Sequence, residues 1–461
     1  MAATIAISPR LSPPSRRRAA AEADVERRQA RPARPAPCTA LDHAASPALR
    51  EQASLRNQAL LAFLIRVASA GLAYMSQILF ARILGVDSYG VFSVAWTFVL
   101  VLGHVAPCGL ADSAVRFLPR YQLRGQNDAA RGFIAMGGET VLIGGAALAI
   151  AGALALIIVP VGEICWPVLG MLACIMPFAY QVWLEGVARG LDRPGLALAC
   201  PYLLRPVLMG LTLAAAALLG HATAGAAMLA ALLTTLATAS IQQVLVQRAA
   251  RLQLGEGKLR SSIRIWLSAS APLAGSTACS QAASYADILA LGLFRSPAEA
   301  AVYIAASKTL ALAGFAQYAL SIVSGRRFAA AKADGAGALA SLATASTRLT
   351  ILAPVTLVLL AGLPLLRLFG QPFSSAYPAL SILCVGAMAR AIAGQKEAVL
   401  TVLGFQRGLF WISFATLAVA MLANLSLTAQ FGATGAACAC ALATIFRSSA
   451  VIALARIALA P

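Results

Sequence analysis

The chain has 461 residues, of which 60% are hydrophobic and only 11% are charged, and its mean hydropathy is +0.80. Soluble globular proteins carry about 25% charged residues, so this composition excludes a soluble protein and predicts a polytopic membrane protein. The net charge of +19 would suggest a nucleic-acid partner for a soluble protein. Here the basic residues lie mostly in the amino-terminal tail and in alternate connectors, which favours a basic membrane face against anionic lipids and no nucleic-acid binding.

The amino-terminal part predicts a tail followed by a transmembrane hairpin. Residues 1–57 are rich in Arg, Ala and Pro, cannot bury a core and are expected to be a disordered, basic cytoplasmic tail. The apolar runs 59–81 and 89–110 are each long enough to cross a bilayer as a helix. The short connector 82–88 joins them into a hairpin, and a polar loop is expected at about 111–131.

Ten further apolar runs give twelve predicted spans in all. They are 132–159, 166–187, 196–219, 224–246, 265–294, 300–324, 349–369, 376–403, 409–429 and 433–455. We therefore expect an amino-terminal six-helix lobe at 58–246, a cytoplasmic linker at 247–264 and a carboxy-terminal six-helix lobe at 265–461. The connectors on one side of the membrane are short and hold only Arg82, Arg295 and Arg367 as basic residues. The positive-inside rule then predicts that both termini are cytoplasmic.

The two predicted lobes repeat each other at a shift of about 212 residues. Residues 89–95 match 300–306, Arg116-Phe117 falls on Arg327-Phe328, and 220–227 resembles 432–437. Six crossings return the chain to the side on which it started, so the two repeats are parallel. Parallel repeats are typical of transporters whose substrate path lies between the halves.

The sequence QILFARILGVDSYG at 77–90 resembles the "ARxLGxxxYG" signature of bacterial polysaccharide-transport proteins. Residues 109–119 and 287–292 resemble the same family, the Wzx-type O-antigen and exopolysaccharide flippases. This family belongs to the multidrug/oligosaccharidyl-lipid/polysaccharide exporter (MOP) superfamily, and the resemblance covers about 58–456. It implies an all-α fold of two six-helix lobes in a V that open alternately to either face.

The same resemblance implies a function and partners. The protein would flip an isoprenoid-diphosphate-linked oligosaccharide, a unit of lipopolysaccharide O-antigen or exopolysaccharide, across a bacterial inner membrane. Its partners would be this lipid-linked oligosaccharide, membrane lipids and a polysaccharide polymerase or export complex.

Ionisable side chains inside the predicted spans are the candidate site residues, because placing them in a bilayer costs several kcal/mol. The cations Arg66, Arg205, Lys308 and Arg390 come two from each lobe, and we predict that they bind the diphosphate or acidic sugars. Each could instead snorkel to the interface or pair with a buried acid. Asp287, deep in the seventh span, is predicted to couple an ion or proton, with a salt bridge to one of the cations as the alternative.

The sequence contains few motifs that are typical of other functional classes. The nine cysteines include no CxxC and no Cys/His cluster, so we predict no disulfide, no metal and no cofactor. No nucleophile–base constellation or phosphate loop indicates an enzyme. Two alternatives stay open: a multidrug/cation antiporter of the same superfamily, and an enzyme or scaffold of polysaccharide assembly.

Overall fold

The structure, a computed structural model, describes residues 47–158, 162–331, 355–393, 396–403 and 405–458. Every element in these ranges is a helix, so the predicted all-α class is confirmed there. Most of the predicted tail, 1–46, lies outside the described residues, and 47–57 are helical. Arg56–Pro461 form one compact unit.

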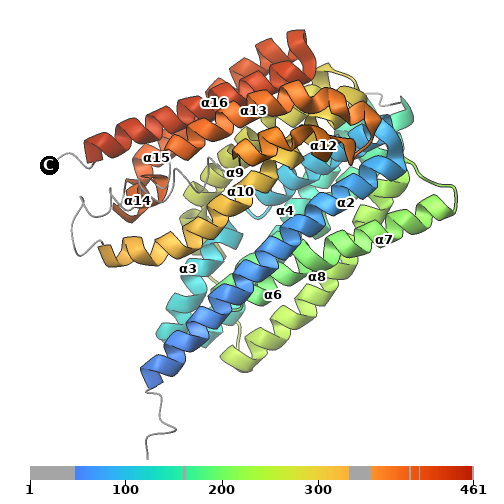
Figure 1. The fold of residues 1–461 in the computed structure, drawn as a ribbon. Helices are drawn as coiled ribbons and strands as arrows, with labels where there is room; N and C mark the ends of the chain where they lie inside the picture. Colours follow the sequence, from blue (N-terminus) through green and yellow to red (C-terminus); the bar gives the residue numbers. More distant parts are fainter. Residues whose placement is uncertain (1–46, 159–161, 332–354, 394–395, 404, 459–461) are drawn as a thin grey trace, which may run out of the picture. The chain divides into compact units, whose positions relative to one another are not determined.

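The first lobe contains seven α-helices in the described residues, and they cover the six predicted spans of this lobe (Figure 1). A short π-helical turn, Cys200–Leu204, joins two of them, α6 and α7, into one span. The helices are α2 (Pro47–Val105), α3 (Leu110–Leu123), α4 (Asn127–Ile158), α5 (Cys165–Gly190), α6 (Pro194–Ala199), α7 (Arg205–Leu218) and α8 (Ala224–Leu254).

Helix α2 reverses its direction at Gly85, which has a φ of 74°. The Tyr89 hydroxyl donates a hydrogen bond of 2.8 Å to Gln77 Oε1, and the ring centroids of Phe80 and Phe92 lie 5.7 Å apart. Both pairs are twelve positions apart, which would be about 18 Å along a straight helix. The two halves of α2 therefore lie against each other, and the predicted hairpin is confirmed.

The prediction of a polar loop at 111–131 is wrong, because most of this segment is helical. The chain breaks at Cys108 and Gly109, both with positive φ, and then forms α3 up to Leu123. Leu110, Ala114 and Leu118 follow one another at intervals of four residues, so their buried side chains lie on one face of this helix. Its basic residues occupy the other face, so a segment that reads as polar in sequence is an amphipathic helix.

The second lobe contains α9 (Ile263–Phe294), α10 (Pro297–Ala331), α12 (Gly362–Arg367), α13 (Tyr377–Ala393), α14 (Lys396–Leu403), α15 (Gln406–Ala423) and α16 (Ala429–Ala458). Part of the predicted span 349–369, residues 349–354, lies outside the described residues. Gly432 turns the chain inside α16 with a φ of 57°, and Gly220, with a φ of 79°, turns it before α8. These two glycines occupy equivalent positions in the predicted repeat.

Only residues 255–262 lie between α8 and α9, so the predicted linker 247–264 is partly helical at both of its ends. Arg131, in the first turns of α4, donates to the backbone carbonyl of Leu254 at 2.5 Å and to that of Gly255 at 3.2 Å. The start of the connection between the lobes is thereby tied to the first lobe.

Seven helices in the described residues are long and apolar enough to cross a membrane, and two of them, Ala68–Leu123 and Arg407–Ala458, span 56 and 52 residues. Each of these two long helices contains a turn, at Gly85 and at Gly432. The chain is thus a multi-pass membrane protein. We call the end of the helices that carries Gly85, Gly220 and Gly432 the Gly85 end, and the opposite end the Arg116 end.

The two lobes touch at the Gly85 end. Arg82 Nε donates a hydrogen bond of 2.7 Å to the backbone carbonyl of Leu368. Gly90 lies so close to Pro297 that a Cβ atom at this glycine would be 1.9 Å from the Pro297 carbonyl oxygen. One hydrophobic core runs through this contact and includes buried side chains of both lobes. This end of the molecule is therefore held closed by direct packing of backbone on backbone.

Candidate functional site

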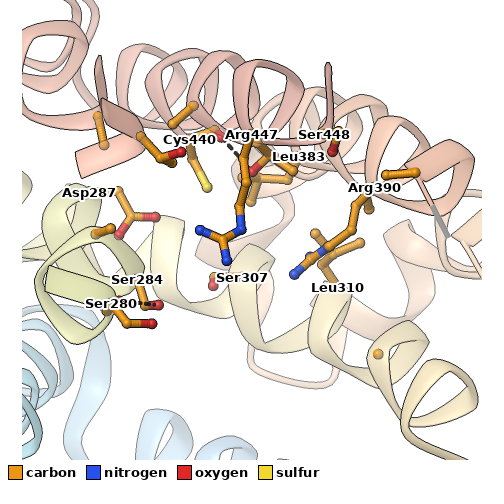
Figure 2. A pocket seen from close by; sticks show the side chains of 18 of the residues that line it. Ser280, Ser284, Asp287, Ser307, Leu310, Leu383, Arg390, Cys440, Arg447 and Ser448 are labelled. Atoms are coloured by element: carbon orange, nitrogen blue, oxygen red, sulfur yellow. Dashed lines mark hydrogen bonds between the residues drawn. The ribbon is translucent and has the colours of Figure 1, made fainter. Parts of the chain in front are cut away.

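A cavity of about 600 Å³ lies within the second lobe, between α9, α10, α13, α14, α15 and α16 (Figure 2). Its walls consist of small apolar side chains and of hydroxyl and amide groups, with no aromatic side chain among the described lining residues. The polar neutral groups are Ser280, Ser284, Ser307, Ser413, Thr416, Asn424, Thr444 and Ser448. Such walls offer hydrogen bonds to a polar ligand from many directions.

Asp287 lines one side of this cavity and already has partners. Its side chain is only 6% exposed, accepts a hydrogen bond from the Tyr303 hydroxyl, and accepts one of 2.8 Å from the Ile288 amide. Lys308, one turn further along α10 than Tyr303, attracts it electrostatically. The carboxylate is therefore compensated by donors from its own helix and from α10. No ion pair of Asp287 with a cation occurs in the described residues, and its coupling role stays a prediction.

Arg447 projects into the cavity from α16 (Figure 2). Its Nη2 lies 2.6 Å from Glu397 Oε1, and its Nη1 donates to Ser413 Oγ at 3.1 Å. Arg447 is not among the site residues predicted from the sequence, although it lies inside the predicted span 433–455. Its charge within that apolar run is the signal that would have identified it.

Arg390 enters the same cavity from α13 (Figure 2). Its side chain is exposed, and within the part of the chain that the structure describes its guanidinium makes no hydrogen bond or ion pair. The cavity thus holds two acids that are bonded, Asp287 and Glu397, one arginine that is paired, and one arginine that is open to a ligand.

Arg205 lies elsewhere, in the first lobe at the start of α7. Its guanidinium carbon is 5.4 Å from the ring centroid of Trp96 and 5.0 Å from that of Phe178. Its Nη1 donates a hydrogen bond of 2.9 Å to Gln181 Oε1. Cation–π contacts of this kind stabilise packed helices. The structure therefore does not bring Arg205 together with Arg390.

The other two predicted ligands are Lys308 and Arg66. Lys308 follows the lining residue Ser307 on α10 but is not itself a lining residue. Arg66 lies in α2, and its side chain is outside the described side chains. Of the four predicted cations, the structure places Arg390 in the cavity and adds Arg447 to it. The described residues contain no group of three or more His, Cys, Asp or Glu side chains suited to a metal ion.

The chain was compared with protein families and with curated protein sequences. Residues 55–324 match the family described as polysaccharide biosynthesis protein. No curated protein sequence matches the chain.

Solved structures share the fold at low sequence identity. The lipid II flippase MurJ in an inward closed conformation has a TM-score of 0.66 at 14% identity, over 86% of this chain and 87% of that chain. An inward-facing multidrug resistance MATE family transporter of the MOP superfamily has a TM-score of 0.64 at 15% identity, over 87% and 98%. A MOP superfamily transporter from Pyrococcus furiosus, described by the reverse polarity of its binding pocket, has a TM-score of 0.62 at 14% identity, over 87% and 95%. The predicted fold class is confirmed.

Proposed function

Because the chain belongs to the polysaccharide biosynthesis protein family and has the fold of MOP superfamily transporters, we propose that it moves an isoprenoid-diphosphate-linked oligosaccharide across a bacterial inner membrane. The oligosaccharide is a unit of lipopolysaccharide O-antigen or exopolysaccharide. Both termini and the Arg116 end face the cytoplasm in this proposal, and a polymerase or export complex takes over the unit on the outer side. The protein transports the unit and does not act as an enzyme on it.

The open guanidinium of Arg390 is the observation that carries this proposal. The Arg390 side chain is exposed to the cavity and has no acid paired with it in the described residues, so its guanidinium is available to an anion. Guanidinium groups bind phosphate oxygens through two parallel hydrogen bonds, and Arg447 lines the same cavity as Arg390. The surrounding hydroxyls can donate to further phosphate or sugar oxygens. Among proteins of this fold, MurJ is named as a lipid II flippase, which agrees with a lipid-linked substrate.

The multidrug/cation antiporter is the alternative, since MATE transporters share the fold. A cationic drug needs a free carboxylate in the cavity. Asp287 already accepts from Tyr303, and Glu397 already pairs with Arg447. The charge distribution therefore favours an anionic substrate. Arg66, Arg205 and Lys308 as further ligands, and Asp287 as a coupling group, stay predictions.

Deletion of the gene, followed by analysis of surface polysaccharide and lipid-linked intermediates, tests the proposal. We expect the polymer to be lost and complete lipid-linked units to accumulate on the inner leaflet. Arg390→Gln should restore much less polymer than the wild-type gene at a normal protein level. Incomplete units, or complete units already exposed outside, would place the defect in synthesis or polymerisation and overturn the proposal. An unchanged polysaccharide with altered drug sensitivity would support the antiporter instead.

A further inference from the structure

The ion pair between Arg447 and Glu397 joins three helices at the wall of the cavity. Arg447 comes from α16, Glu397 from the first turn of α14, and Ser413, the third member, from α15. The Arg447 and Glu397 side chains are 32% and 48% exposed, and both line the cavity. The pair is therefore accessible to a ligand in the cavity and is not sealed in the protein interior.

An ion pair of this exposure is easily exchanged. Exposed pairs typically contribute less than about 1 kcal/mol to stability, because water and neighbouring dipoles compensate the separated charges. A buried pair would instead leave an uncompensated charge when one partner departs. Glu397 also lies in the first turn of α14, where the positive end of the helix dipole favours a carboxylate. Glu397 can thus leave Arg447 at little cost.

The Glu397 carboxylate presents to Arg447 the same kind of oxygen atoms that a phosphate would present. Arg390, which has no such partner in the described residues, offers the first contact to an incoming anion. A ligand with a single negative charge is satisfied by Arg390 alone. A diphosphate carries more charge and more oxygens, and it can engage Arg390 and also compete for Arg447.

We propose that Glu397 is an internal anion that occupies Arg447 until the diphosphate of the lipid-linked substrate displaces it, so that Glu397 sets the selectivity of the cavity. This inference rests on the proposed function. The exchange releases the side-chain contact between α14 and α16 only when a multiply charged ligand is bound. Neutral and cationic ligands leave the pair in place. The Arg447–Glu397 pair then discriminates a diphosphate from other anions, a task that Arg390 alone does not perform.

Binding of farnesyl diphosphate to the purified full-length protein in lipid nanodiscs, measured by titration calorimetry, tests this exchange. Glu397→Gln removes the competing charge and should tighten farnesyl diphosphate binding by about fivefold, the factor that corresponds to the upper value for an exposed pair. Glu299→Gln is the matched control, since Glu299 pairs with Arg295 at 4.0 Å on another helix and outside the cavity. This control should bind like the wild type.

A double-mutant cycle separates the exchange from general effects of charge. Arg447→Gln should weaken binding, and Glu397→Gln should give no further gain in the Arg447→Gln background. An unchanged or weaker affinity of the Glu397→Gln protein, with a normal unfolding temperature, would overturn the inference. The same fivefold gain without Arg447 would also overturn it, because the gain would then come from the overall charge of the cavity.

Failure of the proposed function has a different signature. A wild-type protein that binds no farnesyl diphosphate, or whose binding is unaffected by Arg390→Gln, would refute the function and with it the inference. Glucuronate serves as a second probe, because an acidic sugar carries the other anion that the substrate could present. A gain for glucuronate and none for farnesyl diphosphate on Glu397→Gln would overturn the assignment of the displacing group to the diphosphate.

Discussion

Replacement of Gly90 by alanine should open the protein at the Gly85 end. A Cβ atom at position 90 would lie 1.9 Å from the Pro297 carbonyl oxygen and 2.5 Å from its carbonyl carbon. Real Cβ atoms essentially never approach another heavy atom within 3.0 Å, so the two backbones must separate by roughly 1 Å. Both crowded atoms of Pro297 belong to the backbone, and no side-chain rotation can relieve the clash.

This clash destabilises the closed arrangement of the lobes. Overpacking of this kind costs typically about 1–3 kcal/mol. Gly90 belongs to the first lobe and Pro297 to the second, so separating the lobes at the Gly85 end removes the clash. A cost of about 2 kcal/mol changes the ratio of closed to open molecules by roughly 30-fold. The variant should therefore populate the open arrangement far more than the wild type does.

Labelling of Cys440 measures this change, because this free cysteine lines the cavity. In intact cells treated with a membrane-impermeant thiol reagent, Gly90→Ala should make Cys440 react faster, and Cys440→Ala gives the background. Gly71→Ala is the matched control on the same helix, since a Cβ there meets nothing within 4 Å. Unchanged Cys440 labelling in a correctly folded Gly90→Ala protein would refute the reasoning.

Three further substitutions test individual contacts. Tyr303→Phe leaves the Asp287 carboxylate without its hydroxyl donor and should lower the unfolding free energy by about 1.5–3 kcal/mol; an unchanged thermal midpoint would contradict this. Arg205→Lys keeps the charge but replaces the guanidinium that lies 5.4 Å from the Trp96 ring centroid and should cost about 1 kcal/mol of stability. Lost transport at unchanged stability would instead make Arg205 a ligand. Arg390→Gln should cut transport about tenfold while the unfolding temperature stays the same, and a destabilised protein with normal transport would argue against its role.

The sequence alone determined the class of protein and the course of most spans. The length of an apolar run and the need of a backbone in lipid to satisfy its own hydrogen bonds are local properties, so they can be read without knowing any neighbour. The same holds for the turns at Gly85 and Gly432, where the chain adopts a positive φ that glycine tolerates best. The helix α3 was misjudged because its buried face is recognisable only once its packing partners are known.

Which charges share a cavity was decided by the tertiary structure. Arg205 and Arg390 look alike in sequence, each an arginine within an apolar run. In the fold, Arg205 lies on the rings of Trp96 and Phe178, whereas Arg390 opens into a cavity beside Arg447. The role of a charge depends on the groups that surround it, and in a helical membrane protein those groups come from helices distant in sequence. The sequence supplies the charges, and the packing of the helices decides which of them remain open to a ligand.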